Sequence, residues 1–491
     1  MISSHLPVLQ VVIPLLAAPL SALIRNSTLL WLFSLAVSIL TTVIAYLLLQ
    51  QTTTGIISYA IGGWAAPWGI EYRIDTLNAY VLLIVSSIGS LVLLGGRQSI
   101  EQEIDNKNLS LFYTAYLLCF AGLLGITATG DAFNVFVFLE ISSISSYALI
   151  SMGRDRRALT SSYQYLVMGT IGATFILIGI GLLYMLTGTL NMHDLAQRLT
   201  QVADSRTMLT AFAFLFVGIS LKLALFPLHL WLPNAYAYAP SIVSAFLAGT
   251  ATKVAVYILI RFIFTIFGIE YAFSQLPLSM IMMILAVTAI LIASMSAIYE
   301  HNLKRLFAYS SVAQLGYMVL GISFLSVSGL TSTLLHLFNH ALMKAALFMA
   351  LACVMYVQGN VMMANLTGLG KRMPWTFAAI IIGGLSLVGV PLTVGFISKW
   401  YLILAAIEAG QILLVAIVLI GSLLALVYVW KLVEQGYFQN SEEAITKQEA
   451  PLGLLVGTWI LVLANIYFGI NTSLTIGVAE STAQQLLGVL P

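Results

Sequence analysis

The sequence predicts an all-α, polytopic membrane protein, and three observations carry this prediction. Hydrophobic residues make up 60% of the 491 residues and charged residues only 8%, whereas soluble domains carry roughly 25% charge. The mean hydropathy is +1.01. Apolar stretches of about 20 residues recur along the chain, which is the length that an α-helix needs to cross a hydrocarbon core of roughly 30 Å. These values exclude a water-soluble globular fold and predict about fourteen transmembrane helices.

The first apolar stretch, from His5 to Ile24, is expected to be a spanning helix. No basic residue precedes it and it contains Pro7, Pro14 and Pro19, whereas a cleaved signal peptide begins with a positively charged region. The remaining helices follow from the same apolar periodicity. The expected set is 6–24, 29–50, 75–95, 110–128, 131–151, 163–186, 207–226, 241–265, 277–299, 305–325, 330–357, 375–405, 411–433 and 452–470.

The basic residues of the loops support this count, because an even number of helices makes the loops alternate between two sides. One set of loops carries twelve basic residues: Arg25, Arg97, Lys107, Arg154, Arg156, Arg157, Lys304, Arg305, Lys371, Arg372, Lys431 and Lys447. The other set carries four: Arg73, Arg198, Arg206 and Arg261. Since Lys and Arg collect on the cytoplasmic side of membrane proteins, the split predicts that both termini lie outside.

Two helices are expected to be broken, the seventh at Pro227 and the twelfth at Pro391. A proline removes a backbone donor and clashes with the preceding turn, so each helix must kink or unwind. Paired interruptions five helices apart indicate inverted repeats with the ion path at their interface; two unrelated packing kinks are the alternative.

We therefore expect residues 1–110 to form three N-terminal helices and residues 434–491 to form an inner-side polar stretch and a last helix. Residues 110–265 and 277–433 are expected to form two inverted repeats of five helices each.

Glu140 and four lysines lie inside the apolar segments, far from the loops. An ionised side chain at the centre of a helix costs roughly 2.5–3.5 kcal/mol on insertion scales, so such residues usually have a partner or a function. The lysines are Lys222, Lys253, Lys344 and Lys399. An opposite charge within about 4–6 Å would keep Glu140 and one lysine ionised despite burial. A static ion pair that fixes helix register is the structural alternative.

The eleventh helix carries His336, Asn339, His340 and Lys344 at spacings of three to four residues, which places them on one helical face. Two histidines and a lysine on one face form a ladder of proton-exchanging groups, although a single buried histidine is more often a core residue. Lysine suits such a path because burial and nearby charge change its proton affinity strongly. The arginines map to loops or helix ends, so the partition of the two residue types favours protonation chemistry.

No metal site or cofactor is expected. The histidines and the two cysteines, Cys119 and Cys353, lack the spacing of zinc, iron–sulfur or haem ligands. A glycine-rich phosphate loop after a strand is also missing from the sequence.

The chain resembles the antiporter-like subunits shared by respiratory complex I, membrane-bound hydrogenases and Mrp-type multisubunit cation/proton antiporters, with the D-type subunit of the Mrp antiporters as the most similar branch. The resemblance runs from about Asp75 to the thirteenth helix. The stretches that carry it are Asn134-Val-Phe-Val-Phe-Leu-Glu140, Leu186-Thr-Gly-Thr-Leu-Asn-Met192, Leu221-Lys-Leu-Ala-Leu-Phe-Pro-Leu-His-Leu-Trp-Leu-Pro233, Ala235-Tyr-Ala-Tyr-Ala-Pro240, Ala251-Thr-Lys-Val-Ala-Val-Tyr257, Leu303-Lys-Arg-Leu-Phe-Ala-Tyr-Ser-Ser311, His336-Leu-Phe-Asn-His-Ala-Leu-Met-Lys344 and Gly395-Phe-Ile-Ser-Lys399.

The resemblance implies fourteen helices, broken helices seven and twelve, and roles for the buried residues. Glu140 matches the family's fifth-helix glutamate and Lys222 the seventh-helix lysine that it modulates. Lys253 matches the eighth-helix lysine, and His336, His340 and Lys344 match the connecting relay. Lys399 matches the twelfth-helix lysine at the distal half-channel.

The sequence departs from the family pattern at the start of the sixth helix. Gln164 stands before Tyr165, where the family has a lysine, so any role of that lysine is absent here.

The predicted function is that of a proton-translocating subunit of a multisubunit monovalent cation (Na+)/H+ antiporter in a prokaryotic cell membrane. The alternatives are the pumping subunit of a complex I-like oxidoreductase or membrane-bound hydrogenase, and a non-conducting scaffold for an enzyme. The expected partners are other subunits of such an assembly, protons and a monovalent cation. The sequence does not identify the cation, the stoichiometry or the driving force.

Overall fold

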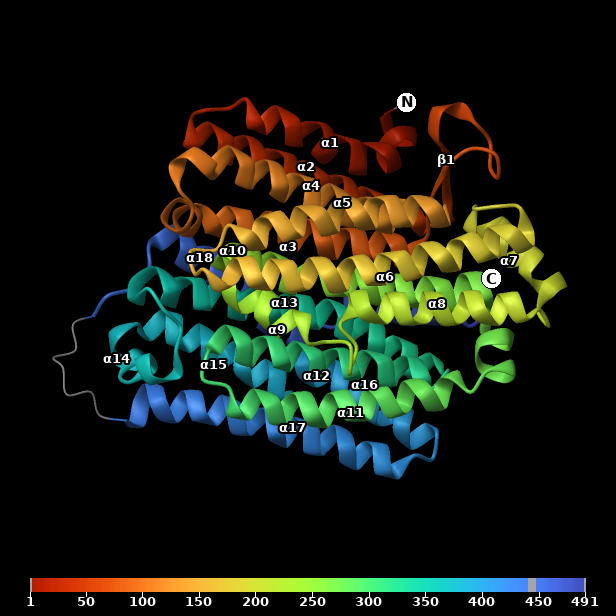
Figure 1. Cartoon of the computed structure of the whole chain (residues 1–491). Helices are drawn as coiled ribbons and strands as arrows, with labels where there is room; N and C mark the ends of the chain where they lie inside the picture. The colour runs from red at the N-terminus through yellow and green to blue at the C-terminus, as the bar shows by residue number, and fades with distance from the viewer. Residues whose placement is uncertain (1, 440–446, 490–491) are drawn as a thin grey trace.

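The computed structural model describes residues 2–439 and 447–489, and its helices run side by side in one bundle (Figure 1). The predicted polar stretch 434–450 lies partly outside the described residues. The helices are α1 (Leu6–Ala22), α2 (Ser27–Thr52), α3 (Thr76–Glu103), α4 (Leu109–Ala128), α5 (Ala132–Ser151), α6 (Arg157–Thr187), α7 (Met192–Leu199), α8 (Arg206–Leu223), α9 (Trp231–Tyr238), α10 (Ser241–Ile260), α11 (Leu278–Tyr299), α12 (Leu303–Ser323), α13 (Val327–Gln358), α14 (Leu369–Arg372), α15 (Pro374–Val388), α16 (Val394–Glu408), α17 (Ile412–Val433), α18 (Leu452–Ile470) and α19 (Ser473–Leu486).

The prediction of an all-α, polytopic membrane protein is confirmed. Among the described residues, twelve helices are long and apolar enough to cross a membrane. Two further apolar helices, α1 and α15, are shorter than a full span. Both chain termini lie at one end of the bundle, together with α7, and α14 lies at the other (Figure 1). We call these the terminal end and the opposite end.

Both predicted helix breaks are present. The helix α8 ends at Leu223, the next residue, Ala224, has a left-handed backbone (φ 57°), and helical structure resumes only in α9. The helix α15 ends at Val388, and α16 begins at Val394 after a turn that contains Pro391. The proline-containing segments therefore divide two apolar helices into half-helices.

Two hairpins of similar construction precede these breaks. Asp131, before α5, forms an isolated antiparallel bridge with Asn191, after α6. Asn302, before α12, forms the same kind of bridge with Met362, after α13. The two bridges have the same sequence separation, and in each case the first residue also caps the helix that follows it. This correspondence is what an internal repeat would produce, and the assignment of two inverted repeats stays a prediction.

The core of the bundle is built around α13. This helix packs against α10, α12, α15, α16 and α18, and its side chains are buried along most of its length. Polar residues on α13 are thus held in the protein interior, away from lipid.

Several elements lie outside the predicted set, among them the short helices α9 and α14. A small antiparallel sheet pairs β1 (Ile57–Ala60) with β2 (Glu71–Ile74). The short helix α7 follows the bridge at Asn191, and α19 continues the chain after α18. The small sheet and α19 contribute to a pocket at the terminal end of the bundle, which Thr482 and Gln485 of α19 line together with Arg73 of β2.

Candidate functional site

Glu140 lies in the middle of α5, a helix whose start is fixed by Asp131. The Asp131 carboxylate accepts a hydrogen bond from the backbone N–H of Asn134 at 2.7 Å, which satisfies one of the free donors at the helix start. Glu140 is half-buried, and its Oε1 atom is buried without a hydrogen-bond partner. A buried acceptor without a donor is costly, so this oxygen is open to a hydrogen bond from a new donor.

Lys222 lies in the last turn of α8, immediately before the helix break. Its Nζ donates a hydrogen bond to Ser143 Oγ at 2.8 Å. Ser143 lies one turn from Glu140 on α5, and the two charges are close enough to interact. The Lys222 ammonium therefore hydrogen-bonds to Ser143, which lies one helical turn from Glu140, the carboxylate that the family resemblance pairs with Lys222.

The freed backbone groups at the end of α8 are satisfied within the protein. The Trp231 indole N–H donates to the Leu221 carbonyl at 3.0 Å, and the Leu225 N–H donates to the Ser220 carbonyl at 3.0 Å. Trp231 stacks on Tyr165 with ring centroids 4.0 Å apart. This packing explains how a broken backbone is tolerated at membrane depth.

Lys253 of α10 is fully buried and has no exposed area. Its Nζ donates to the backbone carbonyl of Ala248 and lies 3.4 Å from Thr252 Oγ1. Among the ion pairs formed by the described residues, none involves Lys253. The lysine is therefore held by neutral oxygens alone.

The three predicted relay residues of α13 share one buried face. His336 Nδ1 lies 2.7 Å from Ser398 Oγ, and the rings of His336 and His340 are nearly parallel with centroids 5.9 Å apart. Both ring nitrogens of His340 are buried without a hydrogen-bond partner. Lys344 Nζ donates to the Phe307 carbonyl at 2.7 Å and to a serine hydroxyl of α12. Unpartnered imidazole nitrogens in the core are costly, and proton transfer through water offers a reason for them.

Lys399 of α16 turns back to cap the broken helix α15. Its Nζ donates to the carbonyls of Leu387 at 2.8 Å and Val388 at 3.0 Å, and to Ser422 Oγ at 2.9 Å. The ammonium also lies 4.9 Å from the centre of the Tyr317 ring. A cation at the carboxyl end of a helix is favourable because the last carbonyls carry partial negative charge.

The structure brings the predicted residues together in two groups. Lys253, Lys344 and Lys399 all lie within electrostatic range of His336, so these bases and His340 form one interior group around α13. Glu140 and Lys222 form the second group. Within the described part of the chain, no hydrogen bond joins the two groups directly.

Two basic residues that the sequence interpretation assigned to loops are buried. Lys304 is 1% exposed and donates to the Ala239 carbonyl at 3.0 Å. Arg261 is 7% exposed and lies within the spanning segment Ser241–Phe267, where it pairs with Asp75 at 2.8 Å. Both predictions were wrong because each residue stands at a helix end, where sequence position does not reveal the direction of the side chain. The position of Arg261 inside the predicted helix 241–265 was the available signal.

His229, within the first break, was not chosen as a site residue. It is 6% exposed, its ring stacks on Phe226, and its Nδ1 atom is buried without a partner. Its ring also lies 6.2 Å from that of Tyr309 on α12. The sequence offered a signal, because His229 stands two residues after Pro227, within the proline-containing break of an apolar helix.

Comparison with known proteins gives consistent matches. The family model described as "NADH:quinone oxidoreductase/Mrp antiporter, TM" matches residues 129–425. NADH-quinone oxidoreductase subunit N of Desulforudis audaxviator is 39% identical over 92% of this chain and 90% of its own length. The D-type subunit of the Na(+)/H(+) antiporter of Bacillus subtilis is 29% identical over 98% of this chain and 97% of its own length.

A solved structure extends this similarity to the fold. A chain of the Mrp complex from Dietzia sp. DQ12-45-1b superposes with a TM-score of 0.90 at 25% identity, covering 99% of this chain and 98% of that chain. The predicted resemblance to antiporter-like subunits is confirmed. Of the two sequence relatives, the oxidoreductase subunit N is the more similar, so the comparison does not favour the Mrp branch over the complex I branch.

Proposed function

Because the chain belongs to the membrane-subunit family of NADH:quinone oxidoreductases and Mrp antiporters, we propose that it is a proton-translocating subunit of a monovalent cation/proton antiporter of the Mrp type. The observation that carries the proposal is the row of buried bases: Lys222, Lys253, His336, His340, Lys344 and Lys399. Bases held in the interior by neutral oxygens, with open imidazole nitrogens between them, are suited to pass protons. The exchanged cation is sodium or another monovalent cation.

The proposed cycle begins at Glu140 and Lys222. When the Lys222 ammonium moves away from Glu140 it loses the favourable charge interaction and releases its proton, leaving a neutral amine. The proton passes to Lys253 and then along the His336, His340 and Lys344 face of α13. Water fills the positions that the open imidazole nitrogens leave free.

Lys399 is the last base of the row. Ser398, the residue before Lys399 in the sequence, links Lys399 to the relay, because His336 of α13 lies within hydrogen-bond distance of the Ser398 hydroxyl. Separation of Lys399 from the end of α15 would release its proton toward the second face of the membrane. The breaks at Pro227 and Pro391 give Lys222 and Lys399 the backbone freedom that these movements require.

A redox-driven role is the second candidate, and a specific observation favours it. The relative with 39% identity is named as a subunit of an NADH-quinone oxidoreductase. In such an assembly the same row of bases would pump protons while another subunit supplies the energy. A third candidate, a scaffold that conducts nothing, is disfavoured by the intact row of buried bases.

The proposed setting follows from the charge distribution and from the relatives. With Lys304 and Arg261 left out, the basic loop residues divide eleven to three, and this split favours a topology in which the opposite end faces the cytoplasm and the terminal end lies outside a prokaryotic cell membrane. The partners are other subunits of a multisubunit antiporter or complex I-like assembly, protons and a monovalent cation.

Dissipation of a pH gradient in inverted vesicles tests the proposal. The complete gene cluster is expressed in an antiporter-deficient host, with wild-type, Lys222→Ala or Lys107→Ala protein, and sodium, potassium or lithium is added. Cation-dependent dissipation that is lost in Lys222→Ala but retained in Lys107→Ala, which changes an exposed loop lysine, supports the antiporter. Proton uptake only on adding a reductant supports the redox candidate, and full activity of a well-expressed Lys222→Ala variant refutes the role of the row.

A further inference from the structure

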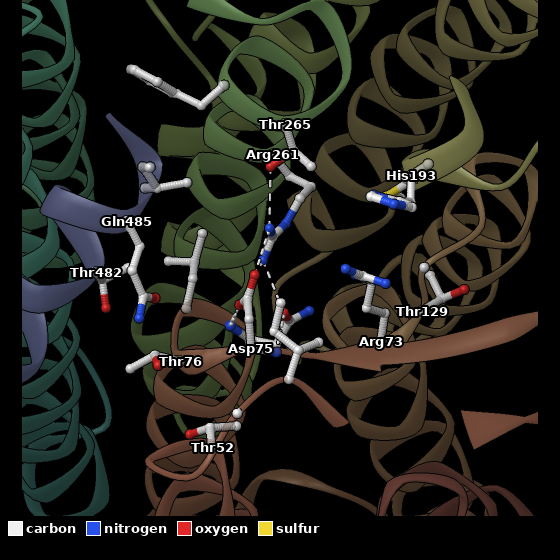
Figure 2. Close-up of a pocket in the computed structure, with 18 residues that line it drawn as sticks. Thr52, Arg73, Asp75, Thr76, Thr129, His193, Arg261, Thr265, Thr482 and Gln485 are labelled. Carbon is white, nitrogen blue, oxygen red and sulfur yellow. Dashed lines mark hydrogen bonds and ion pairs between the residues drawn. The ribbon is translucent and has the colours of Figure 1, made fainter. Parts of the chain in front are cut away.

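A pocket of about 460 Å³ opens at the terminal end of the bundle. We call it the terminal pocket; its polar lining includes Arg73, Asp75, Asn78, Thr129, His193 and Arg261. Figure 2 shows that Asp75 and Arg261 meet at its centre, with Gln485 of α19 on one side and His193 on the other. The pocket is separate from the residues assigned to the row of bases, and nothing in the proposed cycle uses it.

An ion pair and an amide form the inner wall of the terminal pocket. The Arg261 guanidinium donates to both carboxylate oxygens of Asp75, at 2.8 Å and 2.9 Å, and to Asn78 Oδ1 at 2.9 Å. Arg261 occupies both of these oxygens, and Asp75 is the one carboxylate among the described residues of the lining, so these residues present no free carboxylate to a metal cation. Guanidinium groups keep their charge at every accessible pH, and the described lining carries two of them, Arg73 and Arg261, against the one carboxylate of Asp75, so its net charge is unfavourable to metal cations.

Asn78 continues the polar chain inward. Its Nδ2 donates to the Tyr257 hydroxyl at 2.8 Å and to the Thr127 carbonyl at 2.5 Å. The Tyr257 hydroxyl itself donates to the Thr127 carbonyl at 3.1 Å. Asn78 and Tyr257 are 2% and 1% exposed, so the chain of polar groups runs from the pocket into the buried interior.

Tyr257 lies on the same helix as Lys253 of the row of bases. Lys253, Tyr257 and Arg261 occur at successive four-residue intervals on α10 and its π-helical continuation Arg261–Phe267, and therefore share one face. Successive positions on this face are about 6 Å apart along the axis. The fully buried Lys253 thus stands one turn along α10 from Tyr257.

We propose that the terminal pocket is a second opening of the proton path, joining the terminal end to Lys253 through Asn78 and Tyr257, and that it admits water and protons but not metal cations. This inference rests on the proposed function, because it assumes that Lys253 carries protons. Protons move along hydroxyl, amide and water groups by exchanging hydrogen bonds, so a path without a free anionic ligand can still conduct them. The exchanged metal cation must then cross elsewhere in the assembly.

The first test removes a single hydroxyl group. Tyr257→Phe preserves ring packing and removes the hydrogen bond between Asn78 and the Tyr257 hydroxyl, so proton translocation by the complete assembly should fall about tenfold or more. Tyr113→Phe is the matched control, because Tyr113 is equally buried but lies on α4, away from the pocket lining. Thermal stability in detergent is measured for both variants, so that a folding defect is recognised.

The second test blocks the opening without changing the path. In a background of Cys119→Ser and Cys353→Ser, the Gln485→Cys variant places a thiol at the pocket, and Gln484→Cys places one on the neighbouring residue outside the lining. A membrane-impermeant, cationic methanethiosulfonate reagent is added to vesicles whose terminal end faces the medium. Labelling should slow translocation in Gln485→Cys and leave Gln484→Cys unchanged.

The outcomes distinguish this inference from the proposed function. If Lys222→Ala abolishes translocation while Tyr257→Phe and labelled Gln485→Cys both keep the wild-type rate, the second opening is refuted and the row of bases stands. If Lys222→Ala itself keeps the wild-type rate, the proposed function fails, and this inference fails with it.

Discussion

Replacing Arg261 by methionine should destabilise the protein by about 3 kcal/mol. The change removes the ion-pair partner of the Asp75 carboxylate and one of the hydrogen-bond donors to Asn78 Oδ1. Removing one partner of a buried ion pair costs roughly 3–5 kcal/mol. We take the lower end because the Asp75 side chain is 24% exposed in the pocket, where water screens part of the charge.

A double-mutant cycle separates the stranded charge from lost packing. Asp75→Asn removes the charge and retains a residue that caps helices well, so adding it to Arg261→Met should recover about 1–2 kcal/mol. Arg206→Met is the matched control, since Arg206 is an exposed arginine at the start of α8, and it should change the free energy of unfolding by less than about 0.5 kcal/mol.

Reversible unfolding in mixed detergent micelles, followed by circular dichroism, measures these free energies. A loss below about 1 kcal/mol in Arg261→Met, the value expected of a surface pair, would contradict the reasoning. So would an Asp75→Asn change that gives no recovery in the double variant, because the destabilisation would then not come from an unpaired carboxylate.

Three further predictions concern packing, the relay and pH. Gly457→Ala should lower the free energy of unfolding by about 1–3 kcal/mol, because the new Cβ would lie 2.6 Å from Gly95 of α3. The control is Gly477→Ala, whose Cβ would have no neighbour within 4 Å, and it should be neutral in the same unfolding assay. Lys399→Arg should keep the protein folded but abolish translocation in the vesicle assay, since arginine can cap α15 but does not release its proton. Burial raises the pKa of Asp75, but the charge and hydrogen bonds of Arg261 outweigh this and hold the pKa below its usual value. The stabilisation is therefore present above the unfolded pKa of about 3.9 and is lost as the pH falls through the folded pKa, so the stability difference between wild type and Asp75→Asn should shrink in acid; a constant difference would contradict this.

The helix breaks and the buried bases were predictable from sequence because each rests on a local signal. Pro227 and Pro391 interrupt apolar segments, and a lysine within such a segment has no nearby loop to reach. The small sheet was not predictable in this way. Its strands have four residues each, too few to show an alternating pattern, and β2 is held in place by a bridge from Tyr72 to Thr129 at the end of α4.

The partners of the buried groups also required the structure. From the sequence we expect Glu140 to lie near a buried lysine, but only the fold shows that Lys222 Nζ donates its hydrogen bond to Ser143. Likewise, the sequence assigned Lys304 and Arg261 to loops, and tertiary packing turns both side chains into the interior. Periodicity reports which residues share a helix face, whereas the neighbour of that face depends on contacts between helices far apart in the chain.

The neutral surroundings of Lys253, Lys344 and Lys399 have an electrical consequence. Each ammonium is held by backbone carbonyls and hydroxyl groups, and within the described part of the chain no carboxylate forms an ion pair with it. In the proposed cycle, a proton that moves from one of these lysines to the next therefore carries a whole elementary charge through part of the membrane field. Since one charge crossing the full field exchanges about 2.3 kcal/mol per 100 mV, the transport rate of such a protein must depend on the membrane voltage as well as on the pH difference.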